Sequence, residues 1–292
     1  MPGPIPPASV VSCINFPNDK RTVLPQCFIG VDPVNFPTAS AINSGGFVKD
    51  VLEVSSPTVA LPLVVEIEVN SRCNRRCGYC PVSILPNPPV PHFMEREVWD
   101  KLMDELVRIG FTGRISHHFY NEPLLRKDLE VLIADARARL PQSRQILFTN
   151  GDYLTDERYE SLIAAGIDEL IVTRHDFVPV PERDKQVVQM PTDLELSNRA
   201  GAVYEISSAV DLPCFAPTEM LVVTVTGDVV MCTEDAWRKT VVGNIMTRPL
   251  DDIWADERLV SLRRALEAGD RESNDLCRGC DNRNYPVAGV SP

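Results

Sequence analysis

Short β-branched runs alternate with longer segments of helical periodicity through the middle of the chain. The runs predict strands, and the periodic segments between them predict helices. The predicted strands cover residues 61–69, 114–120, 145–150, 169–175 and 186–190. The predicted helices end before Gly110, cover residues 127–140, and run from a Thr155 cap to Gly166. This alternation indicates a parallel sheet, and the segment is too short for eight β/α units. We therefore expect an open, TIM-like partial barrel of the α/β class.

The pattern differs on either side of this segment. Residues 1–60 contain Pro, Gly, Ser and Asn with little periodicity, which predicts an irregular Pro-rich extension. After about residue 207, two β-branched runs over 220–232 predict a hairpin that turns at Gly227–Asp228, followed by a helix over 256–268. The predicted organisation is an extension (1–60), a partial barrel (61–206) and a small α+β module (207–292).

Composition and charge narrow the choice of partners. The 292 residues carry a net charge of −12. This argues against a binder of nucleic acid, which normally presents a basic face. It suits a small polar, cationic substrate, although many cytosolic proteins are equally acidic. We find no apolar run long enough to span a membrane and no signal peptide, so we expect a cytoplasmic protein without membrane partners.

Seven of the nine cysteines fall into two sets, and the first is a C-x3-C-x2-C loop. Cys73, Cys77 and Cys80 directly follow the strand predicted at 61–69. Three thiolates would leave one iron of a [4Fe–4S] cluster open, because a fully ligated cluster needs four. An open iron can bind a substrate or cofactor. A structural zinc site normally closes with four ligands, so we favour the cluster over an incomplete zinc site.

The second set lies in the C-terminal module and has the spacing C-x17-C-x44-C-x2-C. Its members are Cys214, Cys232, Cys277 and Cys280. Four thiolates can close a complete [4Fe–4S] cluster or a tetrahedral zinc site. The spacing alone does not separate these two alternatives.

The first set, in its place after the first strand, resembles the radical SAM superfamily. The resemblance implies that the open iron chelates S-adenosyl-L-methionine (SAM) and that a 5′-deoxyadenosyl radical abstracts hydrogen from the substrate. "YNEPLL" resembles the Gly-Glu-Pro segment that contacts the SAM amino group, with Asn121 in place of Gly. Glu122 is then expected to pair with that ammonium, Tyr79 to contact the adenine, and Asn150 to contact SAM or substrate.

The second set and its connector resemble the twitch module, the short form of the SPASM extension. "VVGNI" and "LDDIWADERL" lie between the cysteines as in those modules. The layout is most similar to the twitch dehydrogenases of butirosin-type aminocyclitol biosynthesis, which oxidise a secondary alcohol. The resemblance implies that this set holds an auxiliary [4Fe–4S] cluster and that Arg199, in "NRAG", faces the substrate. After the strand predicted at 169–175, His175 is a second candidate catalytic residue, beside Arg174 and Asp176.

Two clusters favour an oxidation, because a carbon radical that carries a hydroxyl group must lose one proton and one electron to become a ketone. A closed cluster nearby is a one-electron acceptor, and Arg199 would help the proton to leave. An epimerase is the main alternative, with Cys13 or Cys27 as hydrogen donor. A peptide-modifying maturase and a non-catalytic iron–sulfur or zinc protein are further alternatives. The resemblance also implies a flavodoxin- or ferredoxin-type electron donor.

For the two histidines of the strand predicted at 114–120, His117 and His118, we expect core packing rather than catalysis.

Overall fold

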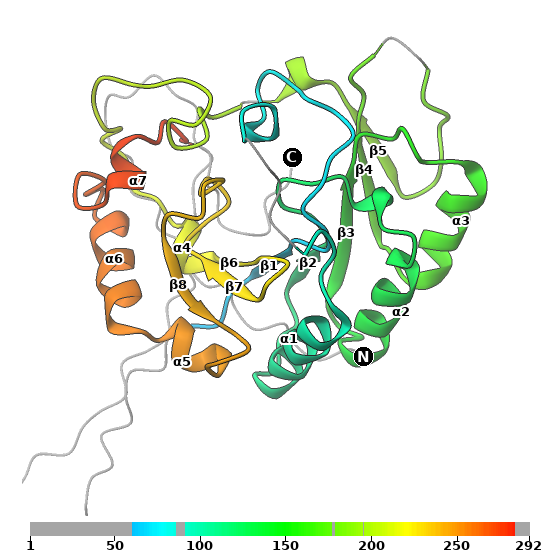
Figure 1. Cartoon of the computed structure of the whole chain (residues 1–292), viewed down its shortest axis with the longest axis horizontal. Helices are drawn as coiled ribbons and strands as arrows, with labels where there is room; N and C mark the ends of the chain where they lie inside the picture. The colour runs from blue at the N-terminus through cyan, green and yellow to red at the C-terminus, as the bar shows by residue number, and fades with distance from the viewer. Residues whose placement is uncertain (1–59, 86–90, 177–178, 195, 284–292) are drawn as a thin grey trace, which may run out of the picture. The chain divides into compact units, whose positions relative to one another are not determined.

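The computed structural model describes residues 60–85, 91–176, 179–194 and 196–283. Its centre is one sheet with the strand order β5-β4-β3-β2-β1-β6-β7-β8, and the sheet does not close on itself (Figure 1). The open α/β barrel expected from the sequence is therefore confirmed. The strands are β1 (Val64–Ile67), β2 (Arg114–Ser116), β3 (Arg144–Thr149), β4 (Glu169–Thr173), β5 (Gln186–Gln189), β6 (Met220–Val223), β7 (Asp228–Val230) and β8 (Val241–Asn244).

The first five strands are parallel to their neighbours, and three helices connect them. The connecting helices are α1 (Arg96–Arg108), α2 (Leu129–Arg139) and α3 (Asp156–Ala165). Their apolar residues pack with those of the strands in one large buried cluster, which includes Trp99, Leu132 and Leu162. Thr155 caps α3 through its side chain, and Gly166 ends it in the left-handed conformation, as the sequence predicts.

Side chains on β1 alternate between two faces of the sheet. Val65 and Ile67 belong to the core that packs against the helices. Glu66 and Glu68, although buried, lie on the opposite, inner face, because successive side chains of a strand point to opposite sides. One face of this strand therefore packs in the core, and the other, which carries the two carboxylates, faces the barrel interior.

The C-terminal hairpin extends the same sheet. β6 pairs in parallel with β1, and β7 and β8 then pair antiparallel. The hairpin is confirmed, and Gly227 in its turn has φ 82°. The region also contains α4 (Ala216–Glu219), α5 (Leu250–Trp254), α6 (Glu257–Glu267) and α7 (Asp275–Arg278). The boundary between barrel and module stays a prediction.

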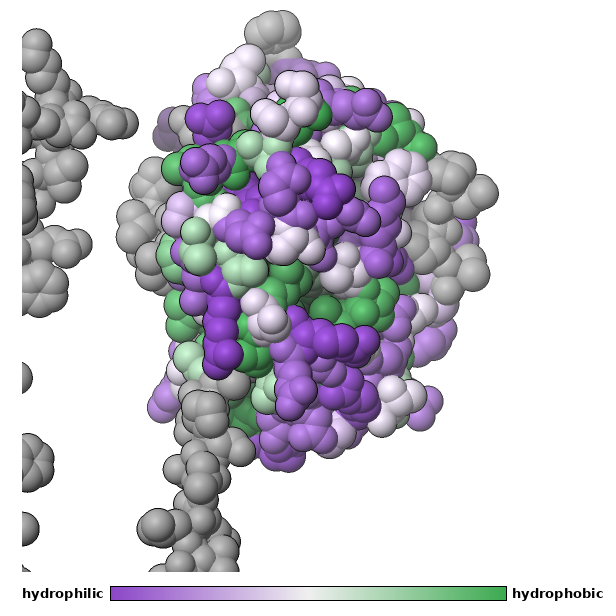
Figure 2. Space-filling view, turned by 90° about the vertical axis from the view of Figure 1, so that its left-hand side faces the viewer, coloured by the Kyte–Doolittle hydropathy of each residue, from purple (hydrophilic) through white to green (hydrophobic). Residues whose placement is uncertain are grey.

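Figure 2 views the molecule from the left-hand side of Figure 1, where α6 lies. Hydrophilic side chains cover most of this face, and hydrophobic ones gather in a hollow near its middle. None of the helices in the described ranges has the length and apolarity needed to cross a membrane.

Candidate active site

The carboxyl edge of the parallel strands gathers most of the polar residues singled out in the sequence. The loop with Cys73, Cys77 and Cys80 follows β1, Glu122 follows β2, Asn150 follows β3, and His175 follows β4. Parallel strands end at the same edge of a sheet, and chemistry in such folds collects there. The topology therefore brings side chains far apart in sequence to one edge.

The loop that carries the first cysteine set is tied down by ion pairs. Arg75 donates to both oxygens of Asp152, at 2.7 and 2.5 Å, and contacts Asp176 at 2.7 Å. Asn74 Nδ2 also donates to Asp152, at 2.6 Å. The three thiols themselves stay half-buried, and burial raises the pKa of Cys73 to about 11. A cationic cluster core would offset that cost, because thiolates are the ligand form.

Glu122 and Asn150 lie side by side under this loop. The Glu122 side chain is 1% exposed and accepts from Thr149 Oγ1 at 2.7 Å and from the backbone N–H of Leu124 and Asn150. Asn150 Nδ2 donates to Asn74 Oδ1 at 2.8 Å and lies 3.9 Å from Cys73 Sγ. Glu122 thus holds the end of β3, and its pairing with a SAM ammonium stays a prediction.

Tyr79, within the cysteine loop, contacts His175. The Tyr79 hydroxyl is 3.3 Å from His175 Nδ1, and the same nitrogen is 3.6 Å from Cys77 Sγ. Burial and the nearby Arg75 lower the pKa of His175. His175 therefore lies against the first cysteine set, and the catalytic role expected for it stays a prediction.

The second cysteine set comes from three separate segments and is buried. Each of its four residues is less than a tenth exposed, and all four line one small cavity with Met231 and Leu276. Burial raises the pKa of Cys277 and of Cys280 to about 12. The four thiols are Cys214 before α4, Cys232 after β7, and Cys277 and Cys280 around α7.

The four thiols could hold a zinc ion or an iron–sulfur cluster. Across the parts of the chain that the structure describes, no three cysteine, histidine or carboxylate side chains converge on a point for one metal ion. A tetrahedral zinc needs four sulfurs about 2.3 Å from a single centre. A cubane places its irons at separate corners and holds the sulfurs further apart. The four buried thiols around one cavity supply the number of ligands that a complete [4Fe–4S] cluster needs.

The "NRAG" segment packs directly on this site in a strained conformation. Arg199 and Ala200 have φ of 53° and 49°, in the left-handed region that non-glycine residues rarely adopt. Asn198 holds the segment in place, because its Nδ2 donates to the carbonyl of Gly279 at 2.8 Å. Gly279 lies between Cys277 and Cys280. The strain thus positions Arg199 beside the loop of the second cysteine set.

Arg199 reaches from that loop toward the first cysteine set. Its guanidinium donates to Glu234 Oε1 at 3.2 Å. Its charge also opposes the burial that raises the pKa of Tyr79, Cys80 and Tyr120, so it lies within electrostatic reach of all three. Arg199 therefore lies between the two cysteine sets.

Tyr120 links the two sets in another way. It follows β2 in the barrel, and its hydroxyl donates to the carbonyl of Thr233 at 2.7 Å. Thr233 is adjacent to Cys232. A hydrogen bond from the barrel thus fixes the backbone beside one thiol of the second set.

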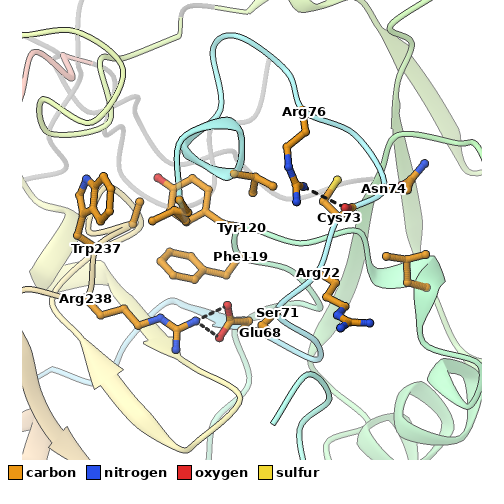
Figure 3. A pocket seen from close by; sticks show the side chains of 14 residues that line it. Glu68, Ser71, Arg72, Cys73, Asn74, Arg76, Phe119, Tyr120, Trp237 and Arg238 are labelled. Carbon is orange, nitrogen blue, oxygen red and sulfur yellow. Dashed lines mark hydrogen bonds and ion pairs between the residues drawn. The ribbon is translucent and has the colours of Figure 1, made fainter. Parts of the chain in front are cut away.

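A cavity of about 640 Å³ opens beside Cys73 (Figure 3). Arg72, Cys73 and Asn74 line one side, and Phe119, Tyr120 and Trp237 line the other. On its floor Arg238 donates to both oxygens of Glu68, at 2.6 and 2.7 Å. The cavity lies between the first cysteine loop and the segment that follows Cys232, so it has the volume and the place for a small polar ligand.

An open barrel, a three-thiol loop at the carboxyl edge of its strands and a separate buried four-thiol site define an iron–sulfur enzyme that uses SAM. A model of the Radical SAM superfamily matches residues 67–178, and a model of the SPASM iron–sulfur cluster-binding domain matches residues 214–281.

Relatives with known functions agree with this class. The chain is 38% identical over 232 residues to the S-adenosyl-L-methionine-dependent 2-deoxy-scyllo-inosamine dehydrogenase of Niallia circulans, covering 75% of this chain and 92% of that one. The crystal structure of BtrN in complex with AdoMet and 2-DOIA matches with a TM-score of 0.70 and 38% identity, covering 77% of this chain and 94% of that one. A PqqA peptide cyclase of Granulibacter bethesdensis is 32% identical over 41% of this chain and 30% of its own length. The protein belongs to the radical SAM superfamily; it is an oxidoreductase whose cofactors are SAM and iron–sulfur clusters.

The site contains residues that the sequence analysis did not single out, notably Asp152, Glu234 and Tyr120. Of the two histidines expected to pack in the core, His117 is fully buried, whereas His118 lies on the inner face and is partly exposed. "VVGNI", described as part of the connector, contains β8, and Cys277 of the C-x2-C pair lies within α7. Cys13 and Cys27 lie outside the described residues.

Proposed function

We propose that this enzyme oxidises a secondary alcohol of an aminocyclitol, or of a similar carbohydrate-like amine, to a ketone. The observation that carries the proposal is the 38% identity that spans 92% of a SAM-dependent 2-deoxy-scyllo-inosamine dehydrogenase. The buried four-thiol site supports it, because oxidation of a carbon radical needs an electron acceptor near the substrate.

Cys73, Cys77 and Cys80 would hold the SAM-binding cluster, and Tyr79 and Asn150 would contact SAM beside it. Glu122 would support Asn150, since its carboxylate accepts a hydrogen bond from the backbone N–H of Asn150. When bound, this cluster and SAM supply a 5′-deoxyadenosyl radical that removes hydrogen from the alcohol carbon. The ion pairs of Arg75 hold the loop still against the barrel rim while substrate binds.

Cys214, Cys232, Cys277 and Cys280 would hold the auxiliary cluster, which supplies a one-electron acceptor when bound. Arg199 lies between the two cysteine sets, where it would donate hydrogen bonds to the substrate oxygen and stabilise negative charge that develops there. His175 contacts Cys77, so if it takes part in catalysis it would do so near SAM.

The substrate would be small, polar and cationic. The cavity beside Cys73 has the volume for such a molecule, and the net charge of the chain, −12, would attract a cation. An epimerase would need a cysteine outside the two sets, and the candidates, Cys13 and Cys27, lie outside the described residues. We further propose a flavodoxin- or ferredoxin-type electron donor and a cytoplasmic location, where clustered thiols stay reduced.

The test is turnover of 2-deoxy-scyllo-inosamine by the anaerobically reconstituted enzyme with SAM and a reductant. With the substrate deuterated at the reacting carbon, we expect deuterium in 5′-deoxyadenosine and one ketone per SAM cleaved. An inverted alcohol that carries solvent hydrogen would instead identify an epimerase. SAM cleavage without deuterium transfer from any aminocyclitol would contradict the substrate class.

A further inference from the structure

A column of polar side chains runs down the inner face of the barrel, apart from the cysteine sites. Glu66 on β1 is the register partner of Ser116 on β2. Because side chains alternate along a strand, Arg114 and His118 lie on the same face as Ser116. His117 lies on the other face, fully buried against Trp99.

The members of this column contact one another. His118 Nδ1 lies 3.1 Å from Glu66 Oε2, and Arg114 Nη2 donates to Glu66 Oε1 at 3.3 Å. The His118 ring packs on Phe148 with 4.4 Å between ring centres. The Glu66 side chain is 4% exposed, whereas those of His118 and Arg114 are 26% and 27% exposed. The column therefore has a buried carboxylate, Glu66, between His118 and Arg114, which solvent or a ligand can reach.

Several buried polar atoms of this column have no hydrogen-bond partner among the described residues. They are Glu66 Oε2, Ser116 Oγ, His118 Nδ1 and Arg114 Nε. Glu66 Oε2 and His118 Nδ1 lie 3.1 Å apart but do not form a hydrogen bond with each other. Native structures rarely leave such atoms unpaired, because each loses its hydration without compensation. The four atoms lie in one layer in which the carboxylate of Glu66 and the imidazole of His118 are 3.1 Å apart, so a proton added to the imidazole would face a carboxylate.

The oxidation needs a proton acceptor that Arg199 cannot be, because a guanidinium stays protonated in proteins. Glu234 already accepts from Ser197, Arg199 and Asn282. Glu122 is likewise occupied, and His175 lies at Cys77. The charge of Arg199 acts on His118 and lowers the pKa of its imidazole. Glu68 accepts from Arg238 and from the backbone N–H of Val225, which leaves His118 as the base that we consider on the inner face.

We propose that His118 is the proton acceptor of the oxidation and that Glu66 positions it; this rests on the proposed dehydrogenase function. After the alcohol carbon has lost its hydrogen atom to the 5′-deoxyadenosyl radical, the O–H bond breaks and the C=O double bond forms. The proton goes to His118 Nε2, the nitrogen that does not face Glu66. The remaining electron goes to the auxiliary iron–sulfur cluster, so that atoms and electrons balance.

The groups around His118 act on its basicity in opposite directions. Burial lowers the pKa of His118, and Arg114, Arg199 and His117 lower it further, so the imidazole is neutral at neutral pH and free to accept a proton. Burial raises the pKa of Glu66 to about 7, opposed by Arg114 and Ser116. Glu66 becomes a carboxylate as the pH rises through that value, and the pair then attracts a proton more strongly.

The first test is His118→Gln, which keeps a polar side chain but removes the base. The measured quantity is ketone formed per 5′-deoxyadenosine, which does not depend on how much protein is folded. We expect this ratio to fall by about 100-fold, a typical contribution of a general base. Calorimetric titration of 2-deoxy-scyllo-inosamine without reductant should show binding within about threefold of wild type. His117→Gln, on the opposite face, is the matched control and should keep the wild-type ratio.

The second test addresses Glu66 as a positioning residue. In wild type we expect the ketone ratio to rise as the pH passes through about 7, as Glu66 loses its proton. Glu66→Gln should give a low ratio without that rise. A structural role alone would lower the ratio and keep the same pH profile.

The outcomes separate the two claims. A wild-type ratio in His118→Gln, or a parallel loss of ketone and substrate binding, overturns the role of His118 and leaves the dehydrogenase intact. Wild-type enzyme that makes no ketone overturns the proposed function, and the role of His118 with it.

Discussion

The two cysteine sites differ in almost every physical respect. The first is a single loop of eight residues, half-buried, whose three thiols face the rim of the barrel. The second draws four thiols from three segments into a buried cavity. The first site has three thiols rather than four and is partly exposed, which suits a cluster that must bind a cofactor at its open iron. A full set in an apolar enclosure suits a cluster that only stores or passes an electron.

The supports of the two sites differ in the same way. Ion pairs at the surface hold the first loop, through Arg75, Asp152 and Asp176. Packing and backbone hydrogen bonds hold the second, through Leu266, Leu276 and the strained segment at Arg199. The exposed site should therefore respond to charge changes and to chelators, and the enclosed site to changes in volume.

The largest effect is expected from Cys80→Ala. Loss of one of three thiolates leaves too few ligands for a stable SAM-binding cluster. Formation of 5′-deoxyadenosine, measured after anaerobic reconstitution and reduction, should fall to the level of the buffer control. Iron in the second site should persist, and cleavage of SAM at the wild-type rate would show that Cys80 is not a ligand.

A selective effect is expected from Cys232→Ala. SAM cleavage should survive, because the first loop is untouched, while ketone per 5′-deoxyadenosine should drop toward zero. Met231→Leu is the matched control: Met231 lines the same cavity, and such a swap usually costs less than about 1.5 kcal/mol. Equal loss of both products in folded Cys232→Ala protein would argue against a separate electron-accepting role.

The smallest effect is expected from Asp152→Asn, which breaks the pair with Arg75. Both side chains are partly exposed, at 24% and 29%, so the pair contributes at most about 1 kcal/mol. Iron should leave the first site up to about fivefold faster under a chelator, with no change at the second site. Asp156→Asn, which removes the surface pair with Arg183, should leave both rates unchanged.

Much of the fold follows from sequence periodicity. Strands such as β3 and β4 are runs of apolar residues flanked by helices with clear caps, so their positions were predicted to within a few residues. β8, α4 and α7 were not: Gly243 interrupts the β-branched run of β8, and a helix of four residues makes only about one turn, too little for a helical period to show.

The cysteine sites could be predicted from the sequence because the spacing of the cysteines along the chain is typical of metal-ligand sets. Glu234 was not, since its partners Ser197, Arg199 and Asn282 meet it only through the tertiary fold. His118 was assigned to the core with His117, because two adjacent histidines on a short strand give no sign of which one faces inward. The one available signal was Glu66, a carboxylate within a buried apolar run.

The most direct test of two separate clusters is the iron and sulfide content of the reconstituted wild type and of a Cys73/Cys77/Cys80 triple Ala variant. We predict about eight irons in the wild type and about four in the variant, the latter held by the buried quartet. A wild type with about four irons plus zinc, and a variant without iron, would show that the quartet is a structural zinc site. The oxidation would then lack its electron acceptor.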